Sequence, residues 1–157
     1  MLRTILGVVL GAIVGVVVIG VVEGAGHTIF PPPLGVNLTD PAQLSTVMSR
    51  ITFPAKVAVL LAWIFGTLAG AATANVVAGR RAWAGRIVTL VILALAVFNM
   101  TTIPHPAWFM AAAVLGVLAA GALADRLRQA APLNAKGARR QARPSSARRL
   151  SSTIRGP

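Results

Sequence analysis

A run of 22 uncharged residues, 57–78, most constrains the fold of this chain. Lys56 precedes the run, and two arginines, Arg80 and Arg81, follow it closely. A helix rises about 1.5 Å per residue, so this length spans the roughly 30 Å hydrocarbon core of a bilayer. Small residues recur along it at every fourth position: Ala62, Gly66, Gly70, Ala74 and Ala78. Because such a row lets two helix backbones approach closely, the run predicts a membrane helix packed against partner helices.

The composition extends this prediction to the whole chain of 157 residues. Hydrophobic residues make up 56% of it and charged residues 11%, whereas soluble domains carry roughly 25% charge. The apolar runs predict membrane spans at about 4–23, 56–78, 87–103 and 106–125. The expected fold is an all-α antiparallel bundle of four transmembrane helices over residues 1–125.

The first apolar run, near the N-terminus, admits two interpretations. A cleaved signal peptide has an apolar region of about 7–15 residues with small residues before the cut. Here the run is longer, and a cut after Ala25 would place Glu23 three residues before the scissile bond. We therefore expect a transmembrane helix, in which Gly7, Gly11 and Gly15 form a double GxxxG motif for close packing. Gly116 lies in a similar small-residue row in the last span.

The segment between the first two spans is predicted to carry a short amphipathic helix at 41–51. Asp40 is a good N-cap, Pro41 suits the first helical position, and apolar residues follow at helical spacing. Such a helix is expected to lie on the membrane surface or to cap the bundle.

The placement of Lys and Arg predicts the orientation. With both termini on one side, thirteen Lys and Arg lie on that side and two, Arg50 and Lys56, on the other. Since basic residues accumulate in cytoplasmic segments, both termini are expected in the cytoplasm. Heavy use of Ala, Gly, Val and Arg suggests a bacterial inner membrane as the location.

Residues 126–157 hold nine Lys and Arg and are expected to form a disordered cytoplasmic tail. Each basic group close to an anionic leaflet contributes on the order of 1 kcal/mol, so lipid headgroups are the expected partner and nucleic acid the weaker alternative. The residues expected to contact lipid are Arg139, Arg140, Arg143, Arg148 and Arg149.

Glu23, His27 and His105 are the candidate polar or ligand-binding residues. Glu23 and His27 are spaced i, i+4 and meet on one face if the first helix persists that far. His105 lies in the connection between the last two spans, at the same predicted side of the membrane. A Glu–His hydrogen bond that fixes the loop is the favoured interpretation. Metal binding by all three residues and handling of a proton or substrate are the alternatives. Asn75 and Asn99 are expected to form hydrogen bonds between helices.

No catalytic motif is present, and three acidic residues in the whole chain make an enzyme hard to build. No cofactor is expected. Small multidrug transporters also have four spans and a functional glutamate, but theirs lies well inside the first helix, whereas Glu23 lies at its edge.

Glu23–Leu44 and Ile103–Phe109 resemble a family of small, uncharacterised bacterial four-helix membrane proteins. The likeness lies in a Glu and a His that close the first span, a Phe-Pro-Pro run and an Ile-Pro-His-Pro turn. It covers about residues 1–125. It implies four spans and a shared rim of Glu23, His27, His105 and the neighbouring prolines, and it implies no activity.

The leading functional hypothesis is a structural or accessory subunit that packs through its small-residue faces into a homo-oligomer or a larger membrane complex. The alternative is a small transporter or channel that uses Glu23 and His27 at an outer vestibule. A metal-binding membrane protein is the weaker alternative.

Overall fold

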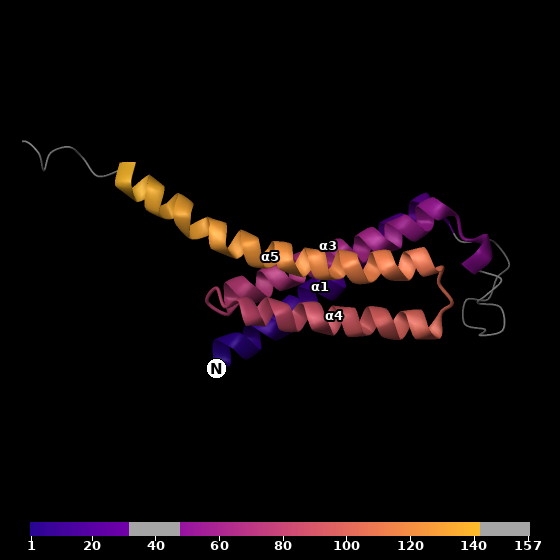
Figure 1. Cartoon of the computed structure of the whole chain (residues 1–157), viewed down its shortest axis with the longest axis horizontal. Helices are drawn as coiled ribbons and strands as arrows, with labels where there is room; N and C mark the ends of the chain where they lie inside the picture. The colour runs from indigo at the N-terminus through magenta and orange to yellow at the C-terminus, as the bar shows by residue number, and fades with distance from the viewer. Residues whose placement is uncertain (32–47, 142–157) are drawn as a thin grey trace, which may run out of the picture.

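The computed structural model describes residues 1–31 and 48–141, with side chains described to residue 129. It contains α1 (Leu2–Ile29), α3 (Phe53–Val77), α4 (Ala82–Thr102) and α5 (Ala107–Gln141). Each of the four is long and apolar enough to cross a membrane. The helices pack against one another as a bundle (Figure 1). The predicted fold class, with four transmembrane helices, is therefore confirmed.

Helix α3 is the centre of the bundle, because it contacts α1, α4 and α5. In Figure 1, α1 and α3 run side by side in opposite directions and obliquely past the hairpin that α4 and α5 form. Helix α1 also contacts α4, but among the described helices α1 and α5 do not approach each other. The uncharged run 57–78, which most constrains the predicted fold, thus lies in the helix that the other three contact.

Glycines bring α1 and α3 together backbone against backbone. A Cβ atom added at Gly11 would lie 2.6 Å from the carbonyl oxygen of Gly70, and one added at Gly70 would lie 2.6 Å from that of Gly11. One turn away, Gly15 faces Gly66 with 3.1 Å between the added Cβ and the carbonyl oxygen. Gly7 faces Ala74. The two small-residue rows predicted from the sequence therefore pack against each other within one chain.

Gly116 on α5 likewise packs inside the bundle, where an added Cβ would lie 2.7 Å from the Cδ1 atom of Ile64 on α3. The remaining surface of α1 carries large exposed apolar side chains. Among them are Leu6, Val9, Leu10, Ile13, Val16 and Val17. Such a surface is favourable in hydrocarbon, so these side chains contact the lipid bilayer.

The turn from α3 to α4 places two consecutive residues in the left-handed region, Gly79 at φ 72° and Arg80 at φ 64°. A non-glycine residue there is conformationally costly and needs support from its surroundings. That support comes from α5: the Arg80 Nη1 group donates to the carbonyl of Arg128 at 3.2 Å, and the Arg128 Nη1 group donates to that of Arg80 at 2.9 Å.

All four helices extend beyond the apolar runs that predicted them. Helix α1 continues through Gly24 and Gly26 to Ile29, because extending an existing helix avoids the cost of nucleation, and it ends just before Pro31. Helix α5 continues to Gln141, beyond the predicted end of the last span at residue 125. The disorder expected of the tail stays a prediction.

A short helix lies between the first and second spans, as predicted, and the described part of the chain includes its residues 48–50. The remainder of the predicted amphipathic helix at 41–51 lies outside the described residues, as do residues 142–157 of the predicted tail.

Candidate functional site

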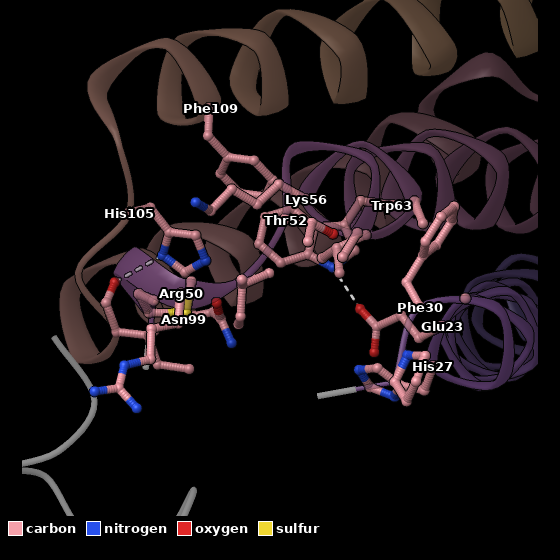
Figure 2. A pocket seen from close by; sticks show the side chains of 18 residues that line it. Glu23, His27, Phe30, Arg50, Thr52, Lys56, Trp63, Asn99, His105 and Phe109 are labelled. Atoms are coloured by element: carbon pink, nitrogen blue, oxygen red, sulfur yellow. Dashed lines mark hydrogen bonds between the residues drawn. The ribbon is translucent and has the colours of Figure 1, made fainter. Parts of the chain in front are cut away.

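A cavity of about 350 Å³ lies at one end of the bundle, which we call the cavity end. It is bounded by the last turns of α1, the first turns of α3, the end of α4 and the start of α5, together with residues 48–52 between α1 and α3. Figure 2 shows the side chains that line it. The labelled ones are Glu23, His27, Phe30, Arg50, Thr52, Lys56, Trp63, Asn99, His105 and Phe109.

Glu23 points from α1 towards α3, where its Oε1 atom accepts a hydrogen bond of 3.0 Å from the Trp63 indole N–H (Figure 2). Trp63 is 7% exposed, and a buried indole N–H needs an acceptor. The favoured interpretation from the sequence, a Glu23–His27 hydrogen bond, was therefore wrong about the partner. Glu23 connects two helices instead of closing a loop.

His27 lies one turn after Glu23 on α1, beside it in Figure 2, because α1 persists through both residues. Its side chain is exposed while lining the cavity. The i, i+4 spacing thus places both residues on one face, as predicted, without a described hydrogen bond between them.

His105 lies on the other side of the cavity from Glu23 and His27 (Figure 2). Its Nδ1 atom lies 2.7 Å from the carbonyl oxygen of Ile103, so Nδ1–H donates to that carbonyl. The imidazole stacks on Phe109 with ring centroids 4.7 Å apart and an interplanar angle of 19°. Both contacts fix the ring at the cavity wall.

The described residues contain no cluster of three His, Cys, Asp or Glu side chains able to hold a metal ion. Glu23, His27 and His105 line the same cavity, but its width separates His105 from the other two. The metal-binding hypothesis for these three residues therefore has no support in the geometry.

The floor of the cavity is a packed apolar cluster. Trp63 and Phe109 meet edge to face with ring centroids 5.7 Å apart, and Phe109 is 1% exposed. Ala62, Ala113 and Val117 are fully buried in the same cluster. Trp63 and Phe109 both line the cavity, so this packed cluster forms one wall of it.

Arg50 and Lys56 give the cavity wall positive charge that no described carboxylate pairs with. Within the described part of the chain, the only ion pair joins Arg86 to Asp125, so neither Arg50 nor Lys56 has a carboxylate within 4.0 Å there. Glu23 is the one acidic side chain among the described lining residues. Most of the other lining residues are apolar.

A polar network holds the opposite end of the bundle, which we call the network end. Asn75 on α3 is 1% exposed. Its Oδ1 atom accepts from the Gly85 N–H of α4 at 2.9 Å, and its Nδ2 group donates to Asp125 of α5 at 3.1 Å. The Arg86 Nε–H donates to the other Asp125 oxygen at 2.9 Å. This network joins α3, α4 and α5 and satisfies both polar atoms of the Asn75 amide.

The sequence predicted an interhelical role for Asn75 but did not single out Arg86 or Asp125. Their positions in the sequence could have indicated that they meet, because Asn75 lies near the end of one span, Arg86 at the start of the next and Asp125 at the end of the last. In an antiparallel bundle these positions share one membrane face. Asn99, by contrast, lines the cavity.

The predicted lipid-contacting residues of the tail divide into two groups. Arg139 and Arg140 lie in the helical backbone of α5, whereas Arg143, Arg148 and Arg149 lie outside the described residues.

No protein-family model, curated protein or solved structure matches this chain. The four spans implied by the resemblance to small four-helix membrane proteins are present. No family is identified, and the family resemblance itself stays a prediction. The functional argument therefore rests on the site.

Proposed function

We propose that this chain is a multi-pass membrane protein that binds a small molecule in the cavity at one end of its bundle. The observation that carries the proposal is the cavity itself, about 350 Å³ in volume, apolar for the most part and lined by a few polar side chains. Small-molecule sites have this character and occur between the helices of bundles, with volumes of roughly 300–1,000 Å³.

The packed floor favours binding over conduction. Because Trp63 and Phe109 close the cavity from below, a molecule that enters it stops at the end of the bundle. Glu23 and His27 line the site, as the vestibule hypothesis requires, but a transport cycle would have to move the floor cluster.

The distribution of basic residues supports an orientation with the cavity outside. Arg80, Arg81 and Arg86 lie at the network end, near the start of the basic segment after Asp125. Under the positive-inside rule the network end and both termini are cytoplasmic. The basic residues that follow α5 then lie beside the anionic headgroups of the inner leaflet. A bacterial plasma membrane fits the composition of the chain.

Native mass spectrometry of the protein released from nanodiscs tests the binding proposal. Wild type is expected to retain a small molecule. Ala58→Trp, which fills the cavity, should abolish this retention, since Ala58 lines the site. Ala111→Trp is the matched control, because Ala111 is exposed on the outer surface of α5. Equal retained mass in wild type and Ala58→Trp, or none in wild type, would contradict the proposal.

A role as a subunit of a larger assembly is the second candidate. The predicted packing glycines already contact other helices of the same chain, so little of their surface is left for a partner chain. They are Gly7, Gly11, Gly15, Gly66, Gly70 and Gly116. Gly20 and Gly24 differ, since a Cβ atom added at either would meet nothing within 4 Å and both lie on the exposed face of α1. Their spacing is that of a GxxxG contact. In the same mass spectra, wild type should be oligomeric and the double variant Gly20→Leu, Gly24→Leu monomeric; a monomeric wild type would exclude this role.

A further inference from the structure

The charge of the cavity wall indicates which class of molecule it takes. Arg50 and Lys56 both line the cavity, and among the described residues neither has a carboxylate partner. Glu23 is the one carboxylate among the described lining residues, and its Oε1 atom already accepts from the Trp63 indole. The described lining therefore holds two basic side chains, Arg50 and Lys56, against one acidic side chain. An anionic group would be favoured there.

The start of α3 adds to this positive character. Thr52, Ala55 and Lys56 line the cavity in the first turn of the helix. No side chain caps this turn, and it contains no acidic residue. Helix N-termini carry a partial positive charge and unpaired N–H groups, so a lysine here increases a potential that is already positive. An anion beside Lys56 would lower the electrostatic free energy of this positively charged helix start.

The rest of the lining determines what the anion is attached to. Phe30, Met48, Ile51, Val59 and Ile103 contribute apolar surface to the same cavity. The volume of about 350 Å³ lies near the lower end of the roughly 300–1,000 Å³ range of small-molecule sites. It therefore suits one short apolar chain better than a large polycyclic body.

We propose that the cavity binds an amphipathic anion, with a carboxylate or phosphate head beside Lys56 and Arg50 and a single apolar chain over the Trp63–Phe109 floor. This inference rests on the proposed function, because it names the ligand class of the same cavity. The head group takes the counter-charge that the described protein residues do not provide. The chain is held by the apolar lining, away from water.

Trp63 provides the reporter for the test, because it lies at the floor of the cavity. Trp83 and Trp108 are changed to Phe, which leaves Trp63 as the only indole. In nanodiscs of neutral phosphatidylcholine, the protein is titrated with three bromine-tipped probes of one chain length: a fatty acid, an alcohol and a trimethylammonium. Bromine quenches an indole on contact, so saturable quenching reports occupation of the cavity.

The fatty acid is expected to bind most tightly. Because a hydrogen bond to a charged group is lost, Lys56→Gln should weaken fatty acid binding about tenfold and leave alcohol binding unchanged. Lys56→Arg should restore it, and Arg50→Gln should weaken it less, since Arg50 is exposed. Arg81→Gln, a loss of the same charge at the network end, is the matched control and should have no effect. Unchanged alcohol binding shows that the cavity is intact in each variant.

The possible failures separate the two proposals. If the alcohol and the acid bind equally and Lys56→Gln changes neither, the cavity is a binding site but the anionic class is wrong. If the trimethylammonium probe binds best and Glu23→Gln abolishes its binding, the site takes cations and the anion proposal is overturned. If no probe quenches Trp63 saturably, the proposed binding function itself is overturned.

Discussion

The two ends of the bundle differ in how their polar and charged side chains are paired. At the network end, the polar atoms of Asn75 meet partners on two other helices, and Asp125 accepts from both Asn75 and Arg86. At the cavity end, one hydrogen bond joins Glu23 to Trp63, while Arg50 and Lys56 lack described carboxylate partners and line a cavity. Polar groups paired across helices fix the arrangement of those helices, whereas charged groups without a described partner leave it less constrained. The network end is thus fixed by paired polar groups, and the cavity end is where we propose that a ligand binds.

The largest loss of stability is expected when a bulky side chain separates α3 from α4 at the network end. In Gly85→Leu, the new Cβ would lie 2.6 Å from Asn75 Oδ1 and 2.8 Å from the carbonyl oxygen of Ala71. We expect a loss of about 3 kcal/mol in the free energy of unfolding, from overpacking and loss of the network. The measurement is an SDS titration in mixed micelles followed by circular dichroism.

A leucine at an exposed position of the cavity end is the control. Ala25 is exposed on α1, so Ala25→Leu should change the free energy of unfolding by less than about 0.5 kcal/mol. Equal losses in the two variants would show that the ends do not differ in packing.

The second test removes the central amide of the network. Asn75→Leu leaves the buried Gly85 N–H unpaired, and we expect a loss of about 1.5 kcal/mol in the same titration. Asn99→Leu is the matched change at the cavity end, where no hydrogen bond of the Asn99 side chain is described. A loss at Asn99 as large as that at Asn75 would count against the contrast.

The third test addresses the single bond at the cavity end. Trp63→Phe keeps an aromatic ring against Phe109 but removes the donor to Glu23, and it should cost about 0.6 kcal/mol. Glu23→Gln keeps an acceptor and should cost less. If Trp63→Phe costs more than Asn75→Leu, the cavity end is the more firmly held of the two.

The smallest effect is expected from the ion pair at the surface of the network. Arg86 is 69% exposed in its side chain, so solvent screens its contact with Asp125, and Arg86→Gln should cost only about 0.3 kcal/mol. Raising the salt concentration should reduce that difference further. A large, salt-independent cost would indicate that Arg86, and not Asn75, holds the network.

Sequence patterns predicted the fold better than the site, for a physical reason. Hydropathy reports the bilayer directly, so four spans follow from runs such as 57–78, and the glycine rows report close packing. Neither pattern indicates which glycine rows pack together. That Gly11 contacts Gly70 depends on how α1 and α3 are aligned in the folded bundle. For the same reason the spacing of Glu23 and His27 suggested a local bond, whereas the partner is Trp63, 40 residues away. The charge imbalance of the cavity depends on which residues meet, and only the fold supplies that.

The central place of α3 has a consequence for how the protein is made. Helix α1, which is translated before α3, buries only Thr4, Gly7, Gly11 and Gly15. Its other side chains, which are mostly apolar, can therefore face lipid as soon as the helix enters the membrane. Its glycine groove then stays vacant until α3 is synthesised and inserted. Docking of α1 on α3 would precede arrival of α4 and α5, which complete the network and the cavity floor. Biosynthesis would therefore assemble the bundle in the order in which its helices are translated.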